Sequence, residues 1–255
     1  MNLLKYNISD EIIAFSTKRG GGNGNYATFN ITHYCGDSEE HVARCREELC
    51  RELNISDDKL ILPYQTHQTN IVSINENFFS LTNKERIQKL YGVDAVVTNL
   101  PQVCIGVSTA DCIPILLYDE INKVVAAIHA GWRGTLNYIV VKTIKFLQKE
   151  YSSNAQFIKV VICPGISLKS FEVGDEVYKA FSDAGFDMNL IARQQEKWHI
   201  DLWEANRIQL LSCGVKSEKI HISGICTYYN YKEFFSARRL GIKSGRIFNG
   251  IMLKK

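Results

Sequence analysis

The chain has 255 residues, 45% of them hydrophobic, and its 30 Lys and Arg side chains nearly balance 27 Asp and Glu, for a net charge of +3. This composition supplies a large hydrophobic core but no field strong enough to favour nucleic acid or a membrane surface. No apolar stretch approaches the roughly 18 residues of a membrane span, and the first residues do not read as a secretory signal.

The cysteines indicate the redox compartment. There are eight, an even number, but a chain of this length without dense cysteine spacing is not a disulfide scaffold. We therefore expect mostly free thiols in a reducing, cytoplasmic protein.

Strands and helices are predicted to alternate along the whole chain. Hydrophobic periodicity and turn residues delimit them. The expected strands are 12–16, 60–62, 70–74, 94–98, 103–107, 113–118, 124–128, 160–163 and 219–222, and the expected helices are 38–53, 82–90, 135–151, 175–183 and 201–211. No linker or repeat interrupts this order, so a single domain over 1–255 is expected.

The only glycine-rich segment, residues 18–26, follows the first of these strands. Glycine permits positive φ, so the segment is either a loop that lets backbone approach a ligand or a plain connection. Its spacing matches neither a Walker loop nor, without a following helix, a dinucleotide fingerprint. Both interpretations stay open, and Asn25 is its candidate for substrate contact.

Three residues far apart in the chain look like one metal site: His67, Cys112 and His129. Each lies where a predicted strand ends or turns, and ligands collect at such edges in open sheets. Two imidazoles and a thiolate suit a borderline-soft ion, and three protein ligands leave a fourth position open, as in catalytic zinc sites.

The same residues permit a different chemistry. A thiolate at Cys112, activated by a histidine, would be a nucleophile of the cysteine-hydrolase type, and the adjacent Asp111 would orient that histidine. A nucleophilic pair needs only one histidine, so the second favours a metal.

Arginines are the second informative set, because a planar guanidinium binds phosphate or carboxylate with two hydrogen bonds. Arg46, Arg133 and Arg238 are the candidates for an anion site. Arg133 is the strongest, since it lies between Trp132 and Gly134, four residues after the candidate ligand His129. An aromatic cluster at 228–235 would either stack on a planar ring or belong to the core.

The central motifs are Gln65-x-His67, Thr109-Ala110-Asp111-Cys112-x-Pro114, His129-Ala130-Gly131-Trp132-Arg133-Gly134 and Phe235-Ser236-x-Arg238-Arg239. Further matches are 24–30, 171–174 and 201–202. Together they resemble the bacterial laccase-domain family, also called the multicopper polyphenol oxidoreductase or peptidoglycan editing factor family, over nearly the whole chain. One departure is Ala237, where the family usually has tyrosine.

The resemblance implies an α+β fold in which mixed β-sheets stack face to face with helices outside, a four-layer α/β/β/α sandwich similar to cysteine hydrolases. It also implies zinc at His67, Cys112 and His129, and a purine nucleoside phosphorylase acting on adenosine, inosine and methylthioadenosine, with adenosine deaminase activity. The older laccase label implies copper, which remains possible, but six histidines are too few for several copper centres.

The expected reaction assigns roles to these residues. Cys112, Asp111 and Arg133 are the catalytic candidates, with Asp111 the carboxylate nearest to an acid or base in deamination. The substrate-binding candidates are Asn25, Arg46, Gln65 and Arg238. The expected partners are a nucleoside and phosphate, without nucleic acid or membrane, in a monomer or weak homo-oligomer. A cysteine-type hydrolase of peptidoglycan precursors, a copper polyphenol oxidase and a non-catalytic binding module are the alternatives.

Overall fold

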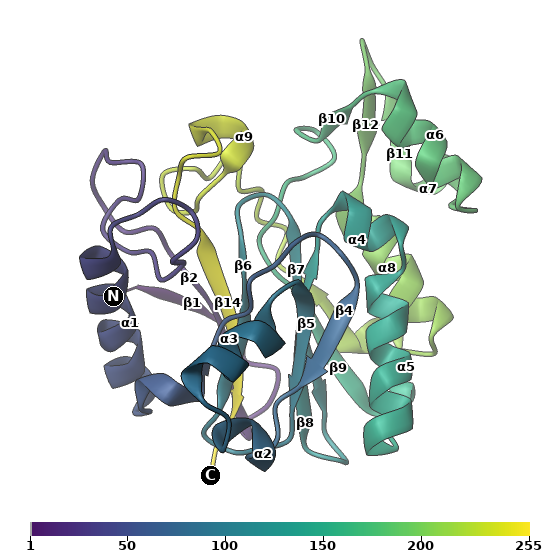
Figure 1. Cartoon of the computed structure of the whole chain (residues 1–255). Coiled ribbons are helices and arrows are strands. Elements are labelled where there is room, and N and C mark those ends of the chain that lie inside the picture. The colour runs from purple at the N-terminus through teal and green to yellow at the C-terminus, as the bar shows by residue number, and fades with distance from the viewer. Residues whose placement is uncertain (1) are drawn as a thin grey trace.

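Two mixed β-sheets stack face to face in the computed structural model, which describes residues 2–255 (Figure 1). One sheet has the strand order β1(Leu3–Lys5)-β2(Ile12–Thr17)-β14(Ile247–Leu253)-β6(Cys104–Thr109)-β3(Leu60–Ile61). The other has the order β13(Ile220–Ile222)-β9(Ile158–Ile162)-β7(Ile113–Asp119)-β8(Val124–Ala130)-β5(Val93–Thr98)-β4(Asn70–Ser73). A small third sheet joins β10(Glu172–Val173), β12(Trp198–Ile200) and β11(Ala192–Gln194).

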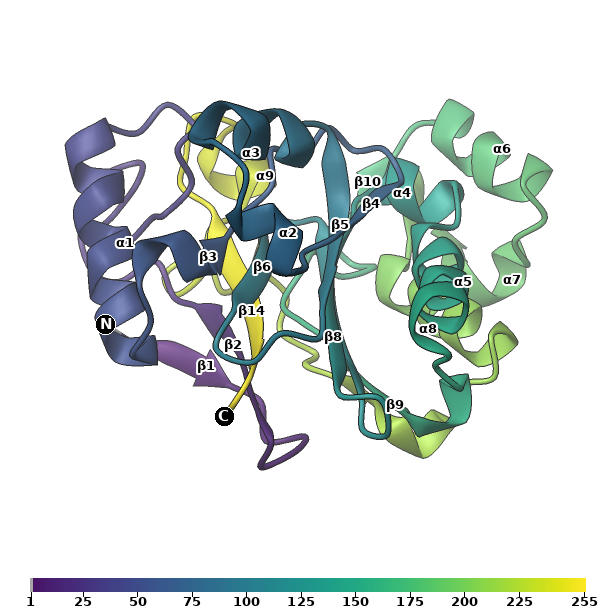
Figure 2. The ribbon, with the colours of Figure 1, turned by 60° about the horizontal axis from the view of Figure 1, so that its bottom comes forward.

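Helices cover the outer faces of both large sheets (Figure 2). Helix α1(Glu39–Leu53) packs Cys45 and Leu49 against the five-stranded sheet, and α5(Ile139–Tyr151) and α8(Leu202–Ser212) pack against the six-stranded sheet. The remaining helices are α2(Glu76–Phe79), α3(Asn83–Leu90), α4(Trp132–Leu136), α6(Asp175–Asp183), α7(Met188–Ile191) and α9(Ala237–Leu240). This arrangement confirms the predicted stacked α+β fold, whereas its likeness to cysteine hydrolases stays a prediction.

The central strands are buried on both faces, which explains their unbroken apolar sequences. In β8, Val124, Ala126 and Ile128 face the helices, and the alternate residues Val125 and Ala127 face the other sheet. By the same alternation His129 points to the side between the sheets, at the end of the strand.

Two of the differences from the sequence-based expectation concern the large layers of the fold. The helix expected at 135–151 is broken between α4 and α5, because Tyr138 takes a left-handed φ of 60°. Its hydroxyl donates to the Ala184 carbonyl at 2.7 Å, and its ring stacks on Phe186. These contacts with residues far away in the sequence outweigh the local helical periodicity. Strand β14 was not foreseen, although it lies in the middle of its sheet between β2 and β6.

Among residues 2–255, no helix is both long and apolar enough to cross a bilayer. All eight cysteines are free thiols in the structure.

Candidate metal centre and its cavity

His67, Cys112 and His129 converge from three separate elements. His67 lies in the loop after β3, Cys112 in the turn between β6 and β7, and His129 near the end of β8. One potential ligand atom from each lies within 4.8 Å of the others, and the Cys112 Sγ to His67 Nε2 distance is 3.9 Å. Zinc bonds of about 2.0–2.3 Å require donor atoms closer than roughly 5 Å. The donor set therefore fits one ion in type and in spacing.

Glycine is required beside this cluster. A Cβ atom on Gly131 would lie 3.0 Å from Cys112 Sγ and 3.2 Å from His67 Cδ2, closer than side-chain carbons normally approach. The glycine after His129 and Ala130 thus leaves room for two candidate ligands, which gives a physical reason for its place in the sequence motif.

The buried carboxylate of Asp94 contacts both the segment that carries His67 and the ring of His129. It accepts hydrogen bonds from the backbone N–H groups of His67 at 3.0 Å and Gln68 at 2.8 Å, and more distantly from that of Thr66. These bonds hold the turn in which His67 takes a φ of 63°. Asp94 also lies 2.7 Å from Nδ1 of His129, which leaves Nε2 of that ring for a metal.

Electrostatics favour the ionised pair of Cys112 and His129. Burial by itself raises the pKa of the Cys112 thiol, but His129 and His67 outweigh it and lower that pKa to about 6. Burial likewise opposes the charge on His129, but the Cys112 thiolate and Asp94 raise the His129 pKa to about 9. Near neutral pH the metal-free site is therefore a thiolate beside an imidazolium.

We expect metal binding to release a proton between pH 6 and pH 9. Above the Cys112 pKa of about 6 the thiolate is present, but His129 must lose a proton below its pKa of about 9 before Nε2 can bind an ion. Zinc affinity should rise about tenfold per pH unit in this window and level off above it. Competition with a chromophoric chelator at pH 6.5, 7.5 and 8.5 measures this, and an unchanged affinity would contradict it.

The cluster opens into a cavity of about 620 Å³. Most of the wall comes from the loops that follow the strands of both sheets, and from the segment that leads into β14. The lining residues are Tyr34, Cys35, Tyr64, Gln65, His67, Ser108, Thr109, Ala110, Cys112, His129, Ala237, Ile242, Lys243 and Arg246. Its volume is that of a pocket for a small molecule.

Asp111 does not line this cavity. Its carboxylate accepts hydrogen bonds from the Thr227 hydroxyl at 2.6 Å and from the backbone N–H of Arg238 at 2.7 Å. Its φ of 88° belongs to the turn that presents Cys112. These contacts fit a positioning role for Asp111 better than the acid or base role expected from the sequence.

The three arginines expected at an anion site lie elsewhere. Arg46 pairs with Asp57 at 2.8 Å and borders a separate cavity beside α1 and α3. Arg133 is exposed and stacks on the Trp132 ring at 4.1 Å. Arg238 is exposed over Phe171 and lines a neighbouring hollow of about 390 Å³, which shares Ala237 and Ile242 with the main cavity.

The other two substrate-binding candidates differ from each other. Gln65 lines the cavity, but its amide already bridges to β6: its oxygen accepts from the Ser108 N–H at 2.7 Å and its nitrogen donates to the Ser108 carbonyl at 2.9 Å. Asn25 is exposed at the edge of another surface hollow, and its carbonyl accepts from the Gly245 N–H at 3.0 Å. Both residues thus support the loops around the cavity.

Several cavity residues were not found by sequence reasoning. Tyr34 and Tyr64 pack ring to ring with centroids 4.6 Å apart, and Tyr64 stacks on the exposed Tyr91. They form an aromatic wall beside the three candidate ligands, whereas Phe234 and Phe235 of the expected stacking cluster are buried in the core. The adjacency of Tyr64 to Gln65 was a usable signal, but nothing in the sequence marked Tyr34, Lys243 or Arg246.

The fold and the site together define an α+β protein with a candidate three-ligand metal centre at the wall of an open cavity. Comparison with known proteins narrows this class. Residues 12–254 match the family model described as multi-copper polyphenol oxidoreductase laccase. The chain belongs to this family, as the resemblance of its motifs predicted.

The relatives carry enzyme names. A protein of Bacteroides thetaiotaomicron named purine nucleoside phosphorylase is 49% identical over 246 residues, which covers 94% of this chain and 91% of the relative. A protein named adenosine deaminase RL5, from an unknown prokaryotic organism, is 42% identical over 94% of both chains. The crystal structure of YlmD from Geobacillus stearothermophilus superposes with a TM-score of 0.92 at 27% identity, covering 100% of this chain and 97% of that one.

Proposed function

We propose that this chain is a zinc-dependent purine nucleoside phosphorylase that acts on adenosine, inosine and methylthioadenosine. The observation that carries the proposal is the convergence of His67, Cys112 and His129 at a cavity of about 620 Å³ with an aromatic wall. The names of two relatives support the same activity: the purine nucleoside phosphorylase at 49% identity, and a Bacillus subtilis protein named purine nucleoside phosphorylase YlmD at 30% identity.

The chain's own residues account for binding and orientation. The exposed Tyr64 side chain, which packs against Tyr34 and Tyr91, offers aromatic surface for contact with a purine. Hydrogen bonds from Gln65 to β6 and from the His67 N–H to Asp94 on β5 tie this segment of the cavity wall to both large sheets. A zinc ion held by His67, Cys112 and His129 would supply Lewis-acid polarisation of the bound nucleoside.

Adenosine deamination is a second activity that the same cavity supports. The relative named adenosine deaminase RL5 is 42% identical, and deamination requires water in place of phosphate. No carboxylate lines the cavity among the described residues, so another lining group such as Tyr34 would have to transfer the proton.

One geometric observation favours a cysteine-type hydrolase as an alternative. Without a metal, Cys112, His129 and Asp94 stand in the order nucleophile, imidazole and carboxylate, and the Cys112 pKa of about 6 provides a thiolate. Copper oxidase chemistry has less support, because His67, Cys112 and His129 are the single cluster of candidate ligands within residues 2–255. Several copper centres would need more.

A substrate panel and a metal analysis test the proposal together. We expect the purified protein to contain about one zinc per chain and to release hypoxanthine from inosine only when phosphate is present. Ammonia release from adenosine without phosphate measures the deaminase activity separately. A metal-free protein that cleaves amide substrates, and loses this activity on alkylation of Cys112, would instead establish the hydrolase. Cytoplasmic location and a monomeric or weakly oligomeric state stay predictions.

Ala237 gives a test of substrate size. It lines both the main cavity and the neighbouring hollow, so a larger side chain there would separate the two spaces. We place the ribose end of the nucleoside at Ala237. We expect Ala237→Trp, which introduces a side chain larger than the tyrosine usual in the family, to lower kcat/KM for methylthioadenosine about tenfold relative to adenosine, because the 5′ substituent loses room. Steady-state kinetics with both nucleosides measure the ratio, and an unchanged ratio would contradict this placement of the ribose end.

A further inference from the structure

Phosphorolysis requires a cation that meets phosphate, and the arginines expected to do this lie outside the cavity. Arg46 is paired with Asp57, Arg133 lies exposed over Trp132, and Arg238 borders the neighbouring hollow. Among the described residues that line the cavity beside the three candidate ligands, two have a lysine or arginine side chain, Lys243 and Arg246. Both come from the segment between α9 and β14.

The Arg246 guanidinium is held in place by its own loop. It donates to the carbonyls of Ile242 at 3.1 Å and Gly245 at 3.0 Å, and also to that of Ser244. These neutral carbonyls position the group without neutralising its charge. No carboxylate pairs with it among residues 2–255.

The charge of Arg246 reaches the cavity wall. Burial raises the pKa of Tyr34 to about 12 and also raises that of Cys35, and in both cases Arg246 opposes the increase. Tyr34 and Cys35 line the same cavity. The positive charge of the guanidinium therefore contributes to the electrostatic potential in the cavity, where a substrate would lie.

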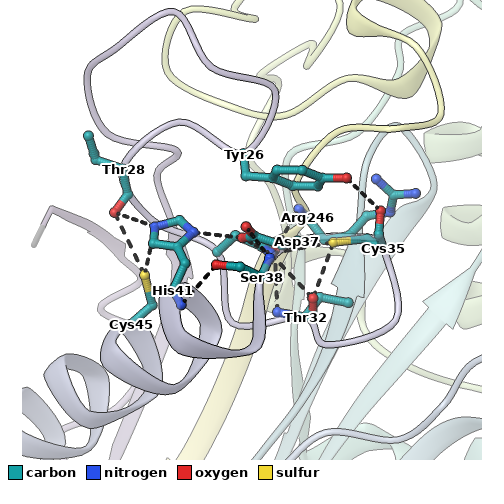
Figure 3. A network of polar contacts seen from close by, with 10 residues as sticks. Tyr26, Thr28, Thr32, Cys35, Asp37, Ser38, His41, Cys45 and Arg246 are labelled. Atoms are coloured by element: carbon teal, nitrogen blue, oxygen red, sulfur yellow. Dashed lines mark hydrogen bonds and ion pairs between the residues drawn. The ribbon is translucent and has the colours of Figure 1, made fainter.

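A polar network anchors this loop to the N-terminal part of the chain (Figure 3). The Arg246 N–H donates to Asn30 Oδ1 at 3.1 Å, and the Asn30 amide donates to Asp37 at 2.8 Å. Asp37 lies 2.7 Å from His41 Nδ1, and that ring contacts Cys45 on α1. The loop that carries Lys243 and Arg246 is thus fixed at its β14 end.

Lys243 differs from Arg246 because its charge has no partner. Its side chain is exposed at the cavity and makes no hydrogen bond or ion pair within residues 2–255. A lysine ammonium is a compact charge with three donors on a flexible stem, so it can move onto an incoming anion. A fixed guanidinium and a free ammonium at one cavity form a typical phosphate site.

We propose that Lys243 and Arg246 form the phosphate subsite of this cavity. Lys243 binds inorganic phosphate, and the guanidinium of Arg246, held by its own loop, supplies a second positive charge at the same cavity. The proposal rests on the proposed phosphorylase activity for its role in catalysis, but the binding of phosphate is testable without turnover. It assigns the anion site to the loop before β14, in place of the three arginines that the sequence motifs suggested.

The test compares Lys243→Gln with Lys232→Gln. Lys232 is also exposed but does not line this cavity, which makes its variant a matched control. In phosphorolysis of inosine, Lys243→Gln should raise the KM for phosphate about tenfold, the lower end for a lost hydrogen bond to a charged group. Lys232→Gln should leave this KM within twofold of the parent. Metal content and the thermal midpoint establish that both variants are folded.

Direct titration of inorganic phosphate separates this proposal from the proposed function. Calorimetry on the zinc-loaded parent should show phosphate binding that weakens about tenfold in Lys243→Gln. If the parent binds phosphate in this way but does not cleave inosine, the phosphate subsite stands and the phosphorylase function fails. If the parent does not bind phosphate, or Lys243→Gln binds it as tightly as the parent, the subsite is overturned.

Discussion

Replacing Cys112 by alanine should abolish both zinc content and nucleoside cleavage. The thiolate is one of three candidate ligands, and its removal leaves two imidazoles, of which His67 is exposed. Substitution of a residue that hydrogen-bonds to a metal ligand lowers metal affinity about 10–100-fold. Loss of the ligand itself should therefore lower zinc affinity by more than about 100-fold. His129→Ala should have the same effect. Zinc per chain, measured by elemental analysis, and hypoxanthine release from inosine give the two readouts.

The control for this experiment is Cys213→Ala. Cys213 is another free thiol, at the C-terminal end of α8, and does not line the cavity. It should retain zinc and activity, which excludes a general effect of thiol removal. If metal-free Cys112→Ala still releases hypoxanthine at the parental rate, the metal has no part in the reaction and the zinc proposal is wrong.

Asp94→Asn should weaken both the metal centre and the fold. The carboxylate accepts backbone N–H groups on both oxygens as well as contacting His129, and an amide must turn an NH₂ group toward some of these donors. We expect a loss of about 3 kcal/mol in the unfolding free energy of the metal-free protein, as for a disrupted bond to a buried charged group. Zinc affinity should fall about 10–100-fold, because the carboxylate orients His129.

Asp119→Asn provides the comparison for Asp94→Asn. Asp119 is equally buried and accepts from the N–H of Ile121 at 2.9 Å and from Asn122. It is the last residue of β7 and pairs with Val124 at the start of β8, the opposite end of that strand from His129. This variant should lose stability and keep its zinc affinity. Denaturant unfolding and chelator competition separate the two effects, and equal zinc affinity in both variants would show that Asp94 has a structural role alone.

The elements with strong local signals were predictable. The helix after Ser38 begins with that residue as N-cap, whose side chain accepts from His41 N–H, and the apolar runs of β6, β7 and β8 were recognisable as buried strands. The break at Tyr138 and the strand β14 were not predictable, because the first depends on contacts with Ala184 and Phe186 and the second pairs with segments over 130 residues away.

The candidate site divides in the same way. The amino-acid sequence by itself determined the three candidate ligands, because they lie in motifs whose small and turn residues leave local signals, such as Gly131 two residues after His129. The resemblance of these motifs to a known family implied the family and the stacked fold. Tertiary structure alone decided which charges face the cavity. Arginine and lysine side chains are long and solvent-tolerant, so their sequence neighbours do not fix where they point. Only the packing of the loop before β14 brings Lys243 and Arg246 to the cavity wall, while Arg46, Arg133 and Arg238 lie outside it.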